Sequence, residues 1–205
     1  KKISNLKLLY KSKNIAAVVV ELARENYEDQ NVIKEIYNFC KKKNICFIVD
    51  EITTGWRGEI GGEYKKYKIK PDLVVYGKAM GNGYAISCVV GSNNYMKCLN
   101  NTFASSTAWT EKVGFAAAES TIDFFKKNKV NNHINQMGDY IVNEWKNISK
   151  KSGVKIKIGN YKAIPSFKFD YKNEQKISTI FTYEMLRKKY LATNSIFLSY
   201  SHKKK

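Results

Sequence analysis

The stretch ICFIVDE, residues 45–51, decides the fold. Its apolar, β-branched and aromatic residues run without interruption into two acids. A continuous apolar run of this length is typical of a strand that is buried on both faces. IAAVVVE at residues 15–21 and LVVYG at residues 73–77 have the same character, and ISCVVGS at residues 86–92 predicts a fourth strand.

Helices are predicted between these strands. NVIKEIYNFCKKKN, residues 31–44, has apolar residues at helical spacing and ends in lysines, which suit the carboxyl end of a helix dipole. Residues 110–128 and 131–153 predict two more helices, and EYKKYKI at residues 63–69 a short helix or turn. Alternating strands and helices with continuously apolar strands predict an α/β fold with a largely parallel sheet.

The pattern changes after Gly153. Strands of alternating, half-exposed character, a helix and a final strand follow, which predicts a smaller α+β domain. We therefore predict a large domain over residues 1–130 and part of a smaller one over residues 131–205. The predicted elements of the second part are strands at 154–159, 163–171 and 196–200 and a helix at 178–190.

Composition narrows the class of protein. The chain has 43% hydrophobic residues, enough for a sizeable core, and no apolar run long enough to span a bilayer. No secretory leader is recognisable, so we expect a soluble, cytoplasmic protein with no membrane partner. The cysteines form no CxxC pair and lie far from both histidines, so we expect buried thiols and no metal site. The cysteines are Cys40, Cys46, Cys88 and Cys98.

The charge balance raises one alternative. Lys and Arg number 36 against 18 Asp and Glu, giving a formal net charge of +18. A basic nucleic-acid-binding module would explain this charge. The lysines, however, are spread along the whole chain, and arginine is scarce. We therefore interpret the charge as solvated helix faces and expect no nucleic-acid partner.

Charged residues of opposite sign follow two of the predicted strands. Asp50 and Glu51 end the second strand, and Lys78 follows the third. In open α/β sheets, ligand sites form beyond the carboxyl ends of the strands. Such residues could form a structural ion pair, bind phosphate with a metal, or serve a pyridine cofactor. In the last case the lysine forms a Schiff base and the carboxylate keeps the ring nitrogen protonated.

Three motifs carry a resemblance to a known family. They are VDEITTGWR at residues 49–57, KPDLVVYGKAMGNGYAIS at residues 70–87 and SSTAWTEKVGFAAA at residues 105–118. In this order and separation they resemble the class III pyridoxal-phosphate-dependent aminotransferases of fold type I, nearest the branch of glutamate-1-semialdehyde aminomutase. The resemblance implies the large domain of that fold, followed by part of its small domain.

The resemblance also implies a cofactor, pyridoxal 5'-phosphate, and a role for each matching residue. Lys78 would be the Schiff-base lysine and proton carrier, and Asp50 would hold the pyridinium nitrogen. Ile52 would pack on one face of the ring, and Glu21 would lie near the cofactor. Thr107 would reach the cofactor phosphate of the partner subunit in a homodimer.

Structural alternatives remain for the same residues. Asp50 could cap a helix or pair with Arg57, and Thr107 could cap the helix predicted to begin near residue 110. Gly77, Gly81 and Gly83 are expected to allow close backbone approach and unusual dihedral angles beside the cofactor ring.

The resemblance implies a transaminase that moves an amino group between a small-molecule amino donor and a carbonyl acceptor. The aminomutase, which transfers nitrogen within one substrate, is the alternative. STAWTEKVG lacks the Gly-Asn-Pro element of that branch and Ala85 replaces a frequent proline, which favours the transaminase. The family's N-terminal half, with its phosphate-binding turn, has no counterpart here. The chain is therefore expected to be a fragment, and an inactive relative is a further alternative.

Overall fold

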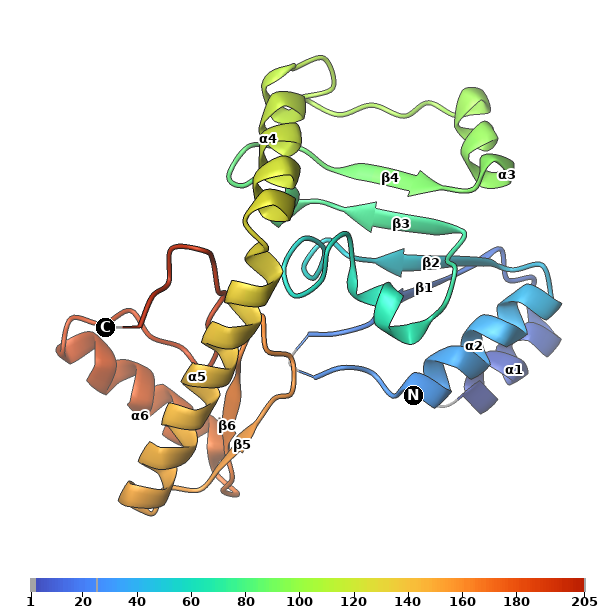
Figure 1. Ribbon diagram of the computed structural model, residues 1–205. Coiled ribbons are helices and arrows are strands. Elements are labelled where there is room, and N and C mark those ends of the chain that lie inside the picture. The colour runs from blue at the N-terminus through green and yellow to red at the C-terminus, as the bar shows by residue number, and fades with distance from the viewer. Residues whose placement is uncertain (1–2, 25, 205) are drawn as a thin grey trace. The chain divides into compact units, whose positions relative to one another are not determined.

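The computed structural model describes residues 3–24 and 26–204. They form two compact units (Figure 1). Unit 1 comprises residues 3–24 and 28–128, and unit 2 comprises residues 26–27 and 129–204. Assignment of these units to the large and small domains of an aminotransferase remains a prediction.

Unit 1 is built on a four-stranded sheet. The strands lie in the order β1-β2-β3-β4, with β1, β2 and β3 mutually parallel and β4 antiparallel to β3. This confirms the predicted α/β fold with a largely parallel sheet. In the register Glu21 lies opposite Asp50, and Asp50 opposite Val75, so the three parallel strands end at one edge. The strands are β1 (Ala17–Glu21), β2 (Cys46–Asp50), β3 (Leu73–Tyr76) and β4 (Cys88–Gly91).

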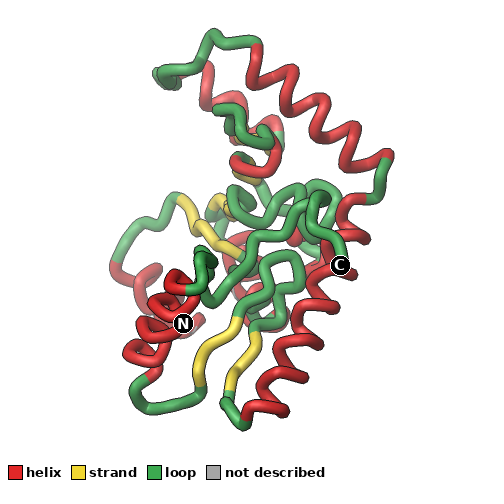
Figure 2. Tube along the Cα trace, turned by 90° about the vertical axis from the view of Figure 1, so that its left-hand side faces the viewer, coloured by secondary structure: helices red, strands yellow, loops and turns green. Residues whose placement is uncertain are grey.

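The predicted helix between the first two strands is α2 (Gln30–Lys42). The Asp29 carboxylate caps it by accepting the backbone N–H groups of Asn31 and Val32 at 2.8 and 3.2 Å. Helix α1 (Ile3–Ser12), which was not predicted, lies beside α2 (Figure 2). The remaining helices of unit 1 are η1 (Glu63–Tyr67), η2 (Lys78–Met80), α3 (Asn93–Met96), η3 (Lys97–Asn101) and α4 (Val113–Lys127).

Burial differs between the strands. In β2, Phe47 and Val49 are fully buried, as predicted. In β1, Val19 is 62% exposed, so the prediction of burial on both faces is wrong for this strand. β1 is an edge strand whose only described strand partner is β2, whereas β2 lies between two strands and contacts α2.

Unit 2 pairs helices with a short hairpin. Its elements are α5 (Val130–Ser152), β5 (Ile156–Ile158), β6 (Phe167–Phe169) and α6 (Glu174–Arg187), and β5 and β6 are antiparallel. Gly138 on α5 lies so near the backbone of Lys162 that a Cβ atom would stand 2.1 Å from its carbonyl oxygen. This glycine therefore allows α5 to pack directly on a neighbouring segment.

The predicted strand at residues 196–200 is wrong. This segment follows residues 163–166 through separate backbone hydrogen bonds, for example from Ile196 N–H to the Pro165 carbonyl at 3.0 Å, and makes one isolated bridge between Ser166 and Ser195. Pro165 has no N–H group to return, which interrupts a regular ladder.

Three further observations concern membrane-spanning helices, metal-ligating groups and the cysteines. No described helix is long and apolar enough to cross a membrane. The described residues contain no group of three or more His, Cys, Asp or Glu side chains that could hold a metal ion. All four cysteines are free thiols, but only Cys40 and Cys46 are buried, so the prediction of buried thiols is wrong for Cys98, which is exposed. Burial raises the pKa of Cys40 to about 11.

Candidate active site

Asp50 ends β2 and fixes the turn that follows it. Its Oδ1 accepts the backbone N–H of Ile52 at 2.9 Å, and the N–H of Gly55 donates to the Glu51 carbonyl at 2.8 Å. A short Asp side chain that binds the backbone two residues ahead stabilises a turn rather than continued strand. The chain therefore reverses at once, and Thr53 stays at the edge where the parallel strands end.

Lys78 follows β3 in a conformation that is unusual for its residue type. Its φ is +43°, in the left-handed region, where a non-glycine residue costs about 1 kcal/mol or more. The turn of η2 holds it there, because Met80 N–H donates to the Gly77 carbonyl and Gly81 N–H to the Lys78 carbonyl, both at 3.1 Å. Lys78 Nζ donates to Thr53 Oγ1 at 2.8 Å. The lysine amine thus meets the loop that follows Asp50.

The three glycines of this segment serve different purposes. At Gly81 a Cβ atom would lie 2.3 Å from the Tyr84 carbonyl oxygen, and Gly83 has a φ of +104°, so both need glycine as predicted. At Gly77 the prediction of an unusual dihedral angle is wrong. Its backbone is extended, and a Cβ atom would find ordinary contacts, the nearest at 3.6 Å from Cγ2 of Ile52.

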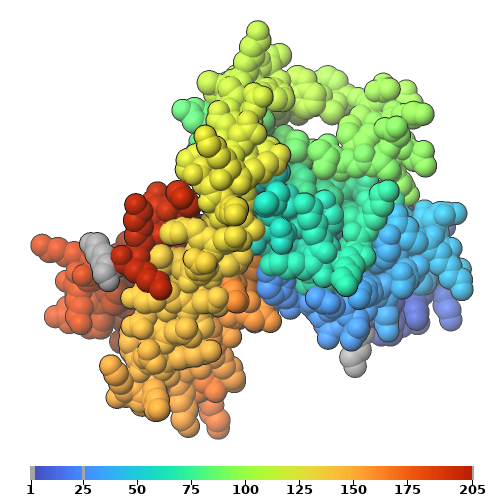
Figure 3. Space-filling view, in the orientation of Figure 1, coloured from blue at the N-terminus to red at the C-terminus, as the bar shows by residue number. Residues whose placement is uncertain are grey.

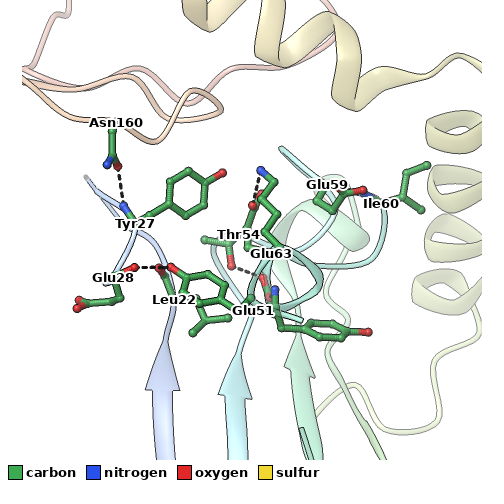
Figure 4. A network of polar contacts seen from close by, with 12 residues as sticks. Leu22, Tyr27, Glu28, Glu51, Thr54, Glu59, Ile60, Glu63 and Asn160 are labelled. Carbon is green, nitrogen blue, oxygen red and sulfur yellow. Dashed lines mark hydrogen bonds and ion pairs between the residues drawn. The ribbon is translucent and has the colours of Figure 1, made fainter. Parts of the chain in front are cut away.

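A buried polar network supports the loop after β2 (Figure 4). The fully buried Glu51 carboxylate accepts the Thr54 hydroxyl and, at 2.9 Å, the backbone N–H of Tyr64. Glu63, also fully buried, pairs with Lys66 at 2.7 Å. Burial raises the pKa of Glu51, and the hydrogen bonds from Thr54 and Tyr64 oppose that rise. The two ends of this loop, at Thr54 and Tyr64, are thereby joined through one carboxylate.

Tyr67, at the end of η1, joins this helix to the residues after β1. Its buried hydroxyl lies 2.8 Å from the Leu22 carbonyl and 2.9 Å from the Glu28 carbonyl, and it donates to this pair of oxygens (Figure 4). Burial raises the pKa of Tyr67 above its ordinary value. The segments that follow β1 and β2 are therefore both held in place by hydrogen bonds from buried side chains.

The predicted site residues fall into three groups. Asp50, Ile52 and Lys78 come together at the ends of β2 and β3. Glu21 lies at the end of the neighbouring strand β1, where its carboxylate pairs with Arg24 Nε at 3.7 Å. Thr107 lies in an exposed turn, and within the described chain no hydrogen bond joins it to Asp50 or Lys78.

The structural alternatives for Asp50 and Thr107 can now be compared with the contacts. The N-cap of α4 is Lys112, so the interpretation of Thr107 as the cap of that helix is wrong. Asp50 does bind backbone, but at a turn rather than at a helix. Arg57 Nε donates to the Thr53 carbonyl at 2.8 Å, which gives this arginine a structural role that the sequence did not predict.

Thr53 is the site residue that sequence reasoning missed. Its hydroxyl accepts a hydrogen bond from the Lys78 amine, and its backbone carbonyl accepts one from the Arg57 side chain. Its neighbour Thr54 has the same side chain but faces the buried Glu51. Two adjacent threonines in a turn look equivalent in the sequence, and only the position of the turn distinguishes them.

The positions of Lys78 and Asp50 at the ends of two adjacent strands indicate the class of ligand site. Within the described residues no ion pair joins Lys78 to Asp50. The Lys78 amine donates a hydrogen bond to the Thr53 hydroxyl, and the Asp50 carboxylate lies at the end of the adjacent strand. A lysine and a carboxylate held apart at one sheet edge are the two groups that a pyridine cofactor with an aldehyde requires. The family model for Aminotransferase class-III matches residues 1–185, and the chain belongs to this family.

Individual relatives agree with this family. The chain is 29% identical over 187 residues to the 3-aminobutyryl-CoA aminotransferase of Cloacimonas acidaminovorans (strain Evry), covering 89% of this chain and 42% of that protein. It is 33% identical over 130 residues to the glutamate-1-semialdehyde 2,1-aminomutase of Nitrosopumilus maritimus (strain SCM1), covering 60% of this chain and 31% of that protein. The chain therefore spans less than half the length of these relatives.

A solved structure shows the same fold. The PLP internal aldimine form of the FumI protein from Sphingopyxis sp. MTA144 superimposes with a TM-score of 0.87 at 20% identity. The match covers 94% of this chain and 48% of that chain. At this identity the likeness establishes the fold of fold type I aminotransferases.

Proposed function

We propose that the protein containing this chain is a pyridoxal-phosphate-dependent transaminase. It would transfer an amino group from a small-molecule donor to a carbonyl acceptor. The observation that carries the proposal is the placement of Asp50 and Lys78 at the ends of adjacent parallel strands, with Lys78 Nζ on Thr53 of the loop that follows Asp50. Membership of the class-III aminotransferase family supports the same reaction.

The residues present fit the cofactor. Asp50 uses Oδ1 for the turn, and the turn fixes the carboxylate at the end of β2, where Oδ2 would accept the ring N–H. Ile52 Cγ2 reaches the neighbourhood of Gly77, so this aliphatic side chain lies between the two strand ends, where it would pack on the ring. Lys78 is exposed and carries a primary amine that would bond the aldehyde carbon. Glu21 at the adjacent strand end would lie at the border of the site.

When bound, the cofactor makes the proton on the amino-bearing carbon of the substrate acidic by withdrawing electrons into its ring. Lys78, once released from the aldehyde, would take up that proton and deliver it to the carbon that carried the aldehyde of the cofactor. The Asp50 carboxylate would keep the ring nitrogen protonated throughout, because a nearby negative charge favours the protonated form. The chain would thus supply the proton carrier and the charge that the reaction needs.

A homodimer would complete the site. Thr107 lies on an exposed turn, in a narrow arm of the chain between α3 and α4 that stands out at the top of Figure 3. Phe103 at 96% exposed and Trp109 at 59% flank it. Large apolar side chains at such exposure favour an interface. We propose that this turn meets a second copy, where the Thr107 hydroxyl would bind the cofactor phosphate.

Absorbance spectroscopy tests the cofactor chemistry. Purified protein is mixed with pyridoxal phosphate, reduced with borohydride and digested for peptide mass mapping. We expect a visible band and a cofactor adduct on Lys78, and loss of both in Lys78→Ala. Lys70→Ala, which changes an exposed lysine eight residues away, is the matched control and should keep both. An adduct on other lysines alone would refute the proposal.

Isotope transfer separates the two candidate reactions. The aminomutase relative supports nitrogen transfer within one substrate, whereas STAWTEKVG and Ala85 favour transfer between molecules. With a ¹⁵N-labelled amino donor and an unlabelled carbonyl acceptor, a transaminase delivers label to the acceptor. Label that moves to a different carbon of the molecule that brought it would establish the mutase. The cytoplasmic location predicted from the sequence remains part of the proposal and is supported by four free thiols.

A further inference from the structure

We propose that Thr53 is a positioning residue for Lys78, an inference that rests on the proposed function. Its hydroxyl accepts a hydrogen bond from Lys78 Nζ at 2.8 Å, a normal length for such a contact. The two residues are 25 positions apart, on the loops that follow adjacent parallel strands. Thr53 would give the amine one defined resting place whenever Lys78 is not bonded to the cofactor.

The position of Thr53 is fixed independently of Lys78. Asp50 accepts the N–H of Ile52, and Gly55 N–H closes the turn onto Glu51. On the other side, Arg57 Nε donates to the Thr53 carbonyl at 2.8 Å. A hydroxyl carried on a backbone that is clamped from both sides can impose its position on a flexible partner.

The lysine needs such a partner. Its side chain has four rotatable bonds, and its exposed amine could otherwise sample many rotamers. A threonine hydroxyl can accept a hydrogen bond from an amine as well as from an ammonium group. The contact can therefore persist whether or not Lys78 carries the proton it is proposed to move. An amine held beside the site reacts faster than one that must first be oriented.

Thr54 is the natural comparison. It has the same side chain in the same turn, but its buried hydroxyl donates to Glu51 instead. If Thr53 acts through Lys78, the two threonines should separate cleanly by their effects. Removal of the Thr54 hydroxyl should lower the stability of the loop. Removal of the Thr53 hydroxyl should slow the reaction of the Lys78 amine with the cofactor.

The test measures how fast Lys78 captures the cofactor. Protein and pyridoxal phosphate are mixed, samples are quenched with borohydride at intervals, and the Lys78 peptide is quantified by mass spectrometry. Thr53→Val, which keeps the shape and removes the hydroxyl, should slow capture about five-fold, the effect of one lost hydrogen bond. Thr53→Ser should restore the rate to within about two-fold. Thr54→Val should lower the thermal midpoint and leave the capture rate unchanged.

Each failure has a separate signature. If the wild type captures at Lys78 but Thr53→Val does so at the same rate, or Thr53→Ser is as slow as Thr53→Val, Thr53 has no positioning role. If the wild type forms no adduct on Lys78, the proposed function fails and this inference with it. Should circular dichroism find Thr53→Val unfolded, the comparison of Thr53→Ala with Thr53→Ser decides the same question. Equal rates in that pair would overturn the inference.

Discussion

Two regions of unit 1 are proposed to bind pyridoxal phosphate, one in its own subunit and the other in a second copy, yet they are built in opposite ways. The strand-end segment, residues 50–81, is held by a buried carboxylate network, a clamped turn and a lysine in a left-handed conformation. The Thr107 segment, residues 102–112, is exposed almost throughout and consists of turns and irregular chain.

The first segment is held in place by contacts within unit 1, whereas the second exposes side chains that are proposed to contact a second copy. In the strand-end segment, the buried polar groups are fixed by partners that lie in the same unit. In the Thr107 segment, the hydroxyl and the aromatic side chains face outward, as expected for residues that act across an interface. Substitutions of buried residues in the first segment should therefore change stability, and those in the second should change mainly cofactor binding.

The largest effect on stability is expected from Glu51→Ala. Removal of this buried carboxylate leaves the backbone N–H of Tyr64 and the hydroxyl of Thr54 without their acceptor. We expect the free energy of unfolding to fall by about 3 kcal/mol, measured by urea denaturation. Glu35→Ala on the exposed face of α2 is the control and should change it by less than about 0.5 kcal/mol. Equal losses in the two variants would contradict the network.

The pH dependence of the same residue gives a second readout. Because burial raises the pKa of folded Glu51, the folded state holds this proton more tightly than the unfolded state. Its contribution to stability therefore decreases as the pH rises from about 4.3, the ordinary value, through the folded pKa. Glu51→Gln has no proton to lose there. The difference in unfolding free energy between wild type and Glu51→Gln should change across that window in favour of the variant.

A smaller effect is expected from the glycines beside the lysine. In Gly81→Ala the new methyl group would stand 2.3 Å from the Tyr84 carbonyl oxygen, so the backbone must shift, at a cost of about 2 kcal/mol. Gly77→Ala finds contacts no nearer than 3.6 Å and should change stability by less than about 1 kcal/mol. Thermal unfolding of both variants tests the contrast. If Gly77→Ala were as unstable as Gly81→Ala, the backbone before Lys78 would require glycine at position 77, contrary to this expectation.

Tyr67→Phe should have a still smaller effect. It removes the hydroxyl that donates to the carbonyls of Leu22 and Glu28, and a lost hydrogen bond of this kind costs about 1 kcal/mol. Tyr190→Phe, at a position 62% exposed, should be neutral and serves as the control. Chemical denaturation measures both. Similar values for the two variants would mean that Tyr67 stabilises the segment through its ring alone.

The smallest effect on folding is expected from Thr107→Val. Thr107 is exposed, and its loss should change the free energy of unfolding by less than about 0.5 kcal/mol. If the hydroxyl binds the cofactor phosphate of a second copy, the affinity for pyridoxal phosphate should fall about ten-fold, by a titration of the visible band. Light scattering on the same sample should still find a dimer. An unchanged affinity would place the phosphate elsewhere.

The sequence by itself determined the sheet and the positions of its catalytic candidates. Continuous apolar runs that end in Asp50 and Lys78 identify strands by local composition alone, because buried strands need apolar residues on both faces. Helix α2 follows in the same way from its apolar spacing and the lysines at its end. These features are local, and neighbouring residues along the chain suffice to predict them.

Only the tertiary structure decided the rest. The exposure of Val19, the missing strand after Ser195 and the separate roles of Thr53 and Thr54 depend on which segments lie opposite one another. Thr53 meets Lys78 because two strands lie in parallel register and two turns end at the same edge. Hydrogen bonds between residues 25 positions apart leave no periodic trace in the sequence, since their partners are chosen by the fold.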